Sequence, residues 1–248
     1  MPEHALGDNF LTARPTAVAM GGCRTLMVHM SDADLLAATP LFQRLPAEAL
    51  VAVLHETSTK TLARNDELFT QNDEAHDLFI VREGRIAIST RARDGRESLV
   101  ALMEPGDLFG EMSMFDGLGR SAGARALEPS VVLSVPYAPV RQALEDRPTV
   151  LWDIAALLVG RLRTADEALA DTAFLDVAGR TAKRLLELAG DDDEFSLPVT
   201  QEELAAMVGA SRERVNKAIA TFVRLRWLAQ HDRRYVITNR AELSKRAQ

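Results

Sequence analysis

Turn residues recur every eight to twelve positions between Thr57 and Tyr137, and this spacing constrains the fold more than any other feature of the sequence. The segments between the turns are short and rich in Val, Ile and Leu: LFIV, RIAIST, SLVALM and VVLSV. Short strands at this spacing are typical of a small antiparallel barrel or jelly-roll. Asn65 and Asn72 lie in the turn segments LARND and TQNDEAHD, and asparagine tolerates a left-handed backbone.

The N-terminal part of the chain lacks this pattern of short apolar segments and turns. Residues 1–29 show no sustained period, and we expect them to be disordered or to reflect an upstream start-codon assignment, with Met30 as the functional start. From Ser31, which has the character of a helix cap, the sequence predicts a short helix that ends before Pro40. A second helix is predicted over residues 47–56.

A long helix is predicted after the barrel, over residues 139–172, with a break at Pro148. Its apolar positions from Leu151 to Thr172 are spaced by three and four, close to the pattern of a coiled coil. Because the barrel offers so long a helix little surface, we predict a two-fold dimer; an ordinary amphipathic core helix is the alternative. The segment FLDVAGR, residues 174–180, interrupts the helical pattern and is interpreted as a hinge.

The segment VTQEELAAMVGASRERVNKAIATFVRLRWL has the spacing of a helix-turn-helix. Thr200 and Glu203 form a capping box at the start of the first helix. Gly209 lies at the tight turn, and Ser211 caps the second helix. The following WLAQHDRRYVITN predicts a β-hairpin wing.

Charge and side-chain chemistry favour DNA as the partner of this segment. Residues 200–248 carry ten Lys or Arg against five Asp or Glu, a net +5, which leaves −12 for residues 1–199. The second helix begins with Arg, Glu and Lys side chains that can read base edges, and the Arg233–Arg234 turn of the wing could contact the DNA backbone. The predicted DNA-contacting residues are Thr200, Gln201, Ser211, Arg212, Glu213, Asn216 and Lys217.

The stretch FGEMSMFDGLGRSAGA predicts an anion site. Gly110 lets a ligand approach the backbone, and the first-turn amides of the short helix around Met112 favour negative charge. Arg120 supplies a fixed guanidinium fork for a phosphodiester, with the Ser121 hydroxyl beside it. Glu111 suits a ribose hydroxyl rather than a phosphate. The set implies a nucleotide; a capped surface turn with a solvent ion pair between Glu111 and Arg120 is the alternative.

The residue inventory argues against several functions. A single cysteine, Cys23, excludes a disulfide framework, an iron–sulfur cluster and a four-cysteine zinc site. No set of Ser, His, Asp or Cys suggests catalysis, so an enzyme is not expected, nor is a metal or a permanent cofactor. No histidine lies in the anion-site stretch or the long helix, which argues against haem sensing. No apolar run approaches the roughly 18 residues of a membrane span, and a cytoplasmic location is expected.

Two motifs carry a family resemblance. GEMSMFDGLGRSA resembles the phosphate-binding cassette of cyclic-nucleotide-binding domains, and FLDVAGR followed by TQEELAAMVGASRERVNKA is similar to the hinge and helix-turn-helix of the cyclic-AMP receptor protein branch of the CRP/FNR regulators. The resemblance implies an α+β chain. Residues 30–149 would form an N-terminal cyclic-nucleotide-binding β-roll (jelly-roll), 150–175 a long dimerisation helix and hinge, and 176–248 a C-terminal winged helix-turn-helix.

The resemblance also implies a mechanism and site residues. A homodimer would bind a cyclic nucleotide effector in the roll and present two recognition helices to a palindromic operator in double-stranded DNA, with RNA polymerase as a further partner. Gly110 and Glu111 would hold the phosphate and the ribose. Arg120 and Ser121 would bind the phosphate, and Arg161 would brace Glu111.

The sequence departs from the family pattern where the base should lie. Members that respond to cyclic AMP usually place a Thr and a polar neighbour on the long helix against the adenine. Those positions are Ala165 and Asp166 here, with Thr164 one residue early. Asp166 accepts but cannot donate when ionised, so it suits guanine better than an adenine edge. Cyclic AMP, cyclic GMP and a cyclic dinucleotide therefore stay open, as does a regulator that binds DNA without cyclic AMP.

Overall fold

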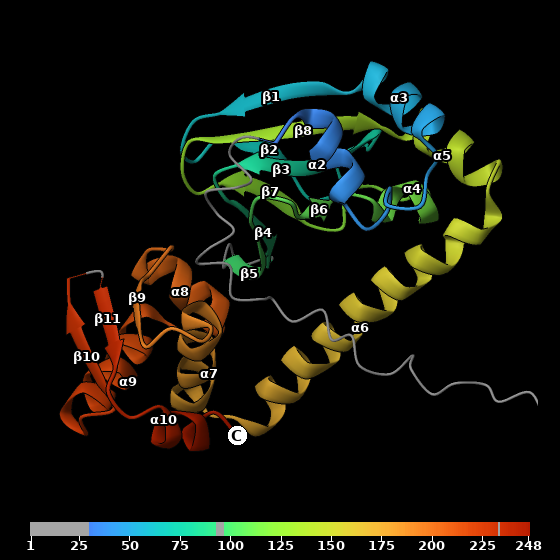
Figure 1. Ribbon diagram of the computed structural model, residues 1–248. Coiled ribbons are helices and arrows are strands. Elements are labelled where there is room, and N and C mark those ends of the chain that lie inside the picture. Colours follow the sequence, from blue (N-terminus) through green and yellow to red (C-terminus); the bar gives the residue numbers. More distant parts are fainter. Residues whose placement is uncertain (1–29, 93–96, 233) are drawn as a thin grey trace, which may run out of the picture.

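The computed structural model describes residues 30–92, 97–232 and 234–248, and Figure 1 shows two folded parts joined by one long helix. The N-terminal part is a roll of two four-stranded antiparallel sheets, with strand orders β1-β8-β3-β6 and β2-β7-β4-β5. The elements of the roll sheets and of the loop between β6 and β7 are β1 (Ser58–Leu62), β2 (Glu67–Phe69), β3 (Asp77–Glu83), β4 (Ile86–Arg91), β5 (Glu97–Met103), β6 (Leu108–Phe109), α4 (Met112–Asp116), β7 (Gly123–Ala126) and β8 (Ser130–Pro136). The predicted α+β class with a jelly-roll is confirmed. The expectations for residues 1–29 and for Arg233 lie outside the described residues.

Strands β3, β4, β5 and β8 coincide with the four apolar segments that the sequence singled out. The prediction missed β1, β2, β6 and β7. Strand β1 reads STKTL and buries only Leu62, so it offers no alternation of apolar and polar residues to detect. Asn65 and Asn72 have φ angles of 70° and 72°, which confirms the expected left-handed turns.

A cluster of three aromatic rings fills the space between the sheets next to β6. The rings of Phe69, Phe79 and Phe109 lie with their centroids 5.5 to 6.2 Å apart. Strands β3 and β6 pair with Phe79 opposite Phe109, and because the pairing is antiparallel, the end of β6 lies beside the start of β3. This register fixes where the chain leaves β6 and enters the candidate anion site.

Three helices cover the outer face of the β1-β8-β3-β6 sheet: α2 (Asp32–Ala38), α3 (Ala47–Glu56) and α5 (Tyr137–Glu145). Ser31 caps α2 through a capping box with Asp34. Both predicted N-terminal helices are therefore confirmed, including the capping serine.

The long helix α6 (Leu151–Phe174) begins after a single 3-10 turn at Pro148, as expected from the position of that proline. Its first turns are anchored in the roll, where Ile154 is buried. Farther along, Leu162 and Leu169 are 60% and 70% exposed, and Figure 1 shows α6 running away from the roll toward the C-terminal part. The second half of α6 therefore presents apolar side chains that its own chain does not cover.

The predicted hinge over residues 174–180 is shorter in the structure. Helix α6 ends at Phe174 and α7 (Val177–Ala189) begins at Val177, so only Leu175 and Asp176 break the helical path. Asp176 is a helix cap rather than a breaker, because its Oδ1 accepts a hydrogen bond from the Gly179 amide at 2.8 Å.

The C-terminal part is a winged helix-turn-helix, as predicted. Its further elements are β9 (Glu194–Ser196), α8 (Gln201–Val208), α9 (Arg212–Arg224), β10 (Leu228–His231), β11 (Arg234–Ile237) and α10 (Arg240–Arg246), with the strands in the order β10-β11-β9. Leu185, Leu204, Val215 and Phe222 form its buried centre.

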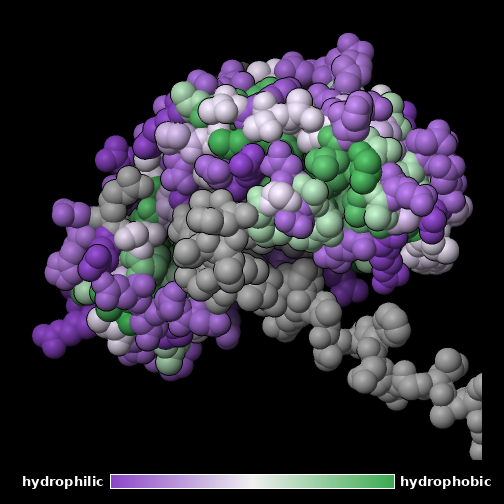
Figure 2. Space-filling model, turned by 45° about the horizontal axis from the view of Figure 1, so that its top comes forward, coloured by the Kyte–Doolittle hydropathy of each residue, from purple (hydrophilic) through white to green (hydrophobic). Residues whose placement is uncertain are grey.

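The surface in Figure 2 is mostly hydrophilic, with hydrophobic side chains gathered on one side of the roll. Among the residues described, no helix combines the length and the apolar character that crossing a membrane requires.

Candidate functional site

The candidate anion site begins at Gly110, directly after β6. Its φ angle is +80°, a left-handed conformation that favours glycine. A Cβ atom at this position would lie 2.7 Å from Nη1 of Arg120. Glycine is therefore required here both by the backbone conformation and by the close approach of the guanidinium.

Arg120 is buried, with only 5% of its surface exposed. Its Nη1 donates to the Gly110 carbonyl at 2.8 Å and to the Tyr137 hydroxyl at 3.1 Å, and its Nη2 donates to the Asp77 carbonyl at 2.7 Å. The guanidinium carbon lies 4.2 Å from the centre of the Phe69 ring, within cation–π distance. Its Nε is buried and has no hydrogen-bond partner among the described residues.

Glu111 is even more buried, at 1% exposed. Arg161 of α6 donates to its Oε1 and also to the Leu108 carbonyl, so one guanidinium ties the long helix to both sides of Gly110. The second carboxylate oxygen, Oε2, is buried and unpartnered within the described ranges. The alternative of a surface turn with a solvent ion pair between Glu111 and Arg120 is wrong, because both side chains are buried and Glu111 pairs with Arg161.

These contacts leave one buried donor and one buried acceptor without partners in the same segment of the roll. Such atoms are rare in folded proteins, and each costs about 1–3 kcal/mol. A ligand with an anionic oxygen for Arg120 Nε and a hydroxyl for Glu111 Oε2 would satisfy both. Because both Nη atoms of Arg120 already bind main-chain carbonyls, a phosphate must use the remaining donor or draw the guanidinium away from those carbonyls.

Tyr137 belongs to this site, although no pattern in the sequence pointed to it. Burial raises the pKa of the Tyr137 hydroxyl, and the nearby positive charge of Arg120 opposes this rise. The protonated hydroxyl donates to the Gly110 carbonyl. It thereby fixes the same peptide that Arg120 contacts.

The other expected ligand contacts are exposed. Met112 and Ser121 lie on the surface of the roll, with the Ser121 hydroxyl 3.5 Å from the sulfur of Met112. Thr164, Ala165 and Asp166 are exposed on α6, and the Thr164 hydroxyl bonds to its own helix at the Gly160 carbonyl. The structure therefore brings Gly110, Glu111, Arg120 and Arg161 together, but leaves residues 164–166 apart from them in a single chain.

The helix-turn-helix has the local geometry that the sequence predicted. Thr200 and Glu203 form the capping box of α8, and Gly209 ends it with a left-handed φ of 68°. Ser211 occupies the cap position of α9, although its hydroxyl makes no capping hydrogen bond. Val215 lies on the buried face of α9.

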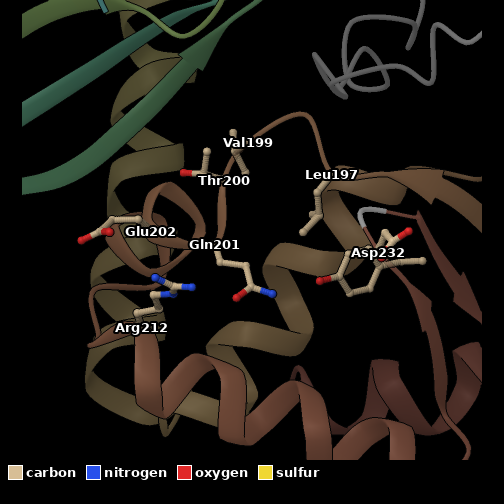
Figure 3. A pocket seen from close by; sticks show the side chains of 8 residues that line it. Leu197, Val199, Thr200, Gln201, Glu202, Arg212 and Asp232 are labelled. Carbon is tan, nitrogen blue, oxygen red and sulfur yellow. The ribbon is translucent and has the colours of Figure 1, made fainter.

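The first turns of α9 present the predicted DNA-reading side chains. Arg212, Glu213 and Lys217 are exposed, while Asn216 is partly buried. Figure 3 shows Gln201 of α8 and Arg212 of α9 reaching into one cleft, which has a volume of about 380 Å³. This cleft lies between the two helices and the wing, and the Gln201 and Arg212 side chains, which can both donate hydrogen bonds, line it.

The wing itself is an antiparallel hairpin of β10 and β11. Arg234 at its tip is exposed and lies 3.0 Å from Glu194 of the neighbouring strand. Within the described ranges, no cluster of three His, Cys, Asp or Glu side chains could hold a metal ion.

Comparison with known families agrees with this geometry. Residues 59–147 match the model of the cyclic nucleotide-binding domain, and residues 179–246 match the model of the Crp-like helix-turn-helix domain. A nucleotide-binding roll joined to a DNA-binding domain of this kind defines a ligand-binding transcription regulator rather than an enzyme.

Curated relatives narrow the class. The chain is 35% identical over 221 residues to the CRP-like cAMP-activated global transcriptional regulator of Mycobacterium tuberculosis, an alignment that covers 86% of this chain and 99% of the relative. It is 30% identical over 177 residues to the cAMP-activated global transcriptional regulator CRP of Escherichia coli, with 68% and 84% covered. The chain belongs to the CRP family of cyclic nucleotide-binding transcription regulators.

Solved structures share the fold. FixK2 from Bradyrhizobium japonicum superposes with a TM-score of 0.71 at 21% identity, covering 77% of this chain and 98% of that one. The c-di-GMP-responsive global regulator CLP from Xanthomonas campestris gives 0.67 at 24% identity, covering 77% and 99%.

Proposed function

We propose that the chain is a homodimeric regulator whose binding to a palindromic operator is controlled by a cyclic nucleotide, with cyclic AMP as the first candidate. The proposal rests above all on the two unpartnered polar atoms buried in the roll, Arg120 Nε and Glu111 Oε2. The names of two curated relatives, both cAMP-activated regulators, support the choice of effector. We further propose the division into a roll (30–149), a dimerisation helix with hinge (150–175) and a DNA-binding domain (176–248).

In this proposal the cassette residues divide the ligand between them. Arg120 and Ser121 bind the phosphate, and Glu111 accepts a hydrogen bond from the ribose hydroxyl. Gly110 allows the phosphate to approach the backbone. Arg161 donates a hydrogen bond to Glu111 Oε1, which supports this division because the ion pair fixes the carboxylate and leaves Oε2 for the ribose hydroxyl.

The base is the part of the ligand that the residues constrain least. Asp166 accepts hydrogen bonds from guanine N1 and N2 donors, and it can also accept from adenine N6. Thr164 can donate and accept beside it. Cyclic GMP is therefore the second candidate, and Asp166→Ser should shift the preference toward cyclic AMP.

The homodimer is supported by the uncovered apolar side chains of α6. Leu162, Leu169 and Phe174 are 60%, 70% and 86% exposed in the single chain. A two-fold axis along α6 would bury them against their symmetry mates. It would also bring residues 164–166 of one protomer toward the cassette of its partner.

DNA recognition follows from the exposed start of α9. Arg212, Glu213 and Lys217 would contact bases, and Thr200 and Gln201 at the start of α8 would contact phosphates. In the dimer, the two α9 helices would enter successive major grooves roughly 34 Å apart. Such an arrangement predicts a palindromic operator.

A thermal-shift panel tests the effector. At a concentration of one hundred times Kd, a ligand that binds only the folded chain adds about 2.7 kcal/mol, which raises the Tm by about 5–11 °C for a chain of this size. We expect this shift with cyclic AMP or cyclic GMP, and its loss in Arg120→Gln. Arg82→Gln is the matched control, because Arg82 pairs with Asp32 within the same roll. A chain that binds DNA but shows no shift with any cyclic mononucleotide or dinucleotide would be a regulator that is constitutive or responds to a different ligand.

A further inference from the structure

A second contact joins the nucleotide-binding roll to the DNA-binding domain, besides α6. Arg125 of β7 places its Nη1 3.6 Å from the carboxylate of Glu203 in α8. Its Nη2 lies 3.8 Å from Glu97 of β5, and its Nη1 donates to the Asn65 side chain at 3.1 Å. The Arg125 and Glu203 side chains are only 22% and 11% exposed, so this ion pair is shielded from solvent more than an ordinary surface pair.

The partner of Arg125 has a structural role of its own. Glu203 is the third residue of the α8 capping box, and its Oε2 accepts a hydrogen bond from the Thr200 amide at 2.7 Å. The other oxygen of the same carboxylate faces Arg125. Arg125 therefore contacts the residue that fixes the start of α8, where the proposed phosphate contacts Thr200 and Gln201 lie.

An apolar contact surrounds the ion pair. Leu99 of β5 and Ala87 of β4 belong to the same buried cluster as Leu204 and Ala205 of α8. Helix α8 packs against β5, and Figure 1 shows the DNA-binding part lying directly beneath the β4–β5 hairpin. The two parts of the chain thus meet over a buried surface.

The position of Arg125 in the chain connects this contact to the nucleotide site. Arg120 is only five residues before it, and β7 begins at Gly123, directly after the cassette. Arg120 and Ser121 lie two to three residues before β7, and β7 is paired on both sides, with β2 and with β4. We therefore expect a displacement of the backbone at these two residues to reach Arg125 through the strand. By contrast, the connection from the nucleotide site to the DNA-binding domain through α6 runs the length of that helix and across the break at residues 175–176.

We propose that Arg125 is a positioning residue that couples the nucleotide site directly to the DNA-binding domain, and that its contact with Glu203 opposes nucleotide binding. The inference rests on the proposed function. The sign of this coupling follows from the structure, in which the Arg125–Glu203 contact is present while the two Nη atoms of Arg120 bind main-chain carbonyls. A phosphate that draws Arg120 away from those carbonyls pulls on β7 and weakens the contact. By linkage, loss of the contact strengthens nucleotide binding.

The test combines hydrogen–deuterium exchange with calorimetric titration of cyclic AMP on the full chain. Arg125→Gln removes the charge, and Arg125→Lys restores it. Glu203→Gln removes the partner charge while its side-chain oxygen can still cap α8. Arg82→Gln is the control, because the ion pairs of Arg82 with Asp32 and Glu83 stay within the roll.

We expect Arg125→Gln and Glu203→Gln each to speed exchange in β5 and α8 without nucleotide, and to lower the Kd for cyclic AMP about two- to fivefold. The double variant should add little to either single change, because both remove one contact. Arg125→Lys should recover most of the wild-type Kd, and Arg82→Gln should match wild type. A merely structural role predicts a lower Tm with an unchanged Kd.

The outcomes separate this inference from the proposed function. If wild type and Arg125→Gln bind cyclic AMP equally well, or if Arg125→Gln binds it more weakly, the coupling is refuted while the effector stands. If wild type binds neither cyclic AMP nor cyclic GMP, the proposed effector fails and the coupling fails with it; if wild type binds only cyclic GMP, the same titrations are made with that nucleotide. Unchanged exchange in β5 and α8 would show that the contact does not hold the two parts together.

Discussion

The buried pair of Glu111 and Arg161 gives the sharpest stability prediction for the roll. Replacing Arg161 by methionine keeps much of the volume of the side chain but removes the only hydrogen-bond partner that the Glu111 carboxylate has among the described residues. The variant therefore leaves a charge buried at 1% exposure without compensation. The ion pair also joins α6 to the cassette, so its loss should lower the stability of the whole roll.

The expected magnitude follows from the burial of the two partners. Removing one member of a buried ion pair costs about 3–5 kcal/mol. Since the Arg161 side chain is 35% exposed, water reaches that end of the pair, and the lower value of about 3 kcal/mol applies. For a chain of this size, that cost lowers the Tm by about 6–12 °C.

Differential scanning calorimetry at pH 7 measures this shift. The double variant Arg161→Met with Glu111→Gln should recover about half of the loss, because the neutral amide is cheaper to bury than the carboxylate. Arg44→Met is the matched control: Arg44 pairs with Asp153 at 3.3 Å, but its side chain is 71% exposed, so its loss should cost under about 1 kcal/mol. An Arg161→Met chain that melts within about 2 °C of wild type would refute this reasoning.

Three further predictions concern the cassette, the hinge and the dimer. Gly110→Ala forces a left-handed alanine and places its Cβ 2.7 Å from Arg120 Nη1. Scanning fluorimetry should therefore show that the free energy of unfolding falls by about 1–2 kcal/mol and that nucleotide binding is weaker. Unaltered binding would contradict the cassette geometry. The pKa of Asp176 is lowered, first by a hydrogen bond from the Gly179 amide and then by Arg246 of α10. The Asp176 carboxylate therefore stabilises the fold at pH values above its unfolded pKa, which is about 4. This stability is lost as the pH falls through the lower folded pKa. Asp176→Ala should therefore cost about 1 kcal/mol at pH 7 and less at pH 3, and an equal loss at both pH values would argue against the charge. Leu162→Glu with Leu169→Glu should sediment as a monomer where wild type sediments as a dimer, and a dimer that persists would place the interface elsewhere.

Patterns in the sequence predicted those elements that are determined by residues close together in the chain. The capping serine at position 31, the capping box of Thr200 and Glu203, and the turn at Gly209 all depend on residues within one turn of each other. The apolar strands β3, β4, β5 and β8 follow from burial on the sheet faces. The polar edge strand β1 and the short glycine- and alanine-containing strand β7 lack that signal, because pairing with neighbouring strands defines them.

The interior of the site depends on contacts that are distant in sequence. Arg120 is held by the Asp77 carbonyl and the Tyr137 hydroxyl, 43 and 17 residues away. The sequence predicted a fixed guanidinium fork for a phosphodiester, whereas the structure shows both of its Nη atoms bound to main-chain carbonyls. No pattern within the motif could reveal this, because the pairing of β3 with β8 brings Asp77 next to Tyr137, and the pairing of β3 with β6 brings both to Gly110. The same holds for the contact between Arg125 and Glu203, whose residues belong to different motifs.

Calorimetric titration of cyclic AMP into wild type and Arg120→Gln measures most directly whether the buried guanidinium binds the effector phosphate. A hydrogen bond to a charged group contributes about 1.5–3 kcal/mol, so the account predicts a Kd about ten- to a hundredfold weaker in Arg120→Gln, with circular dichroism showing the fold retained. Equal affinity in the two proteins would contradict the account, because the phosphate would then be held by other groups.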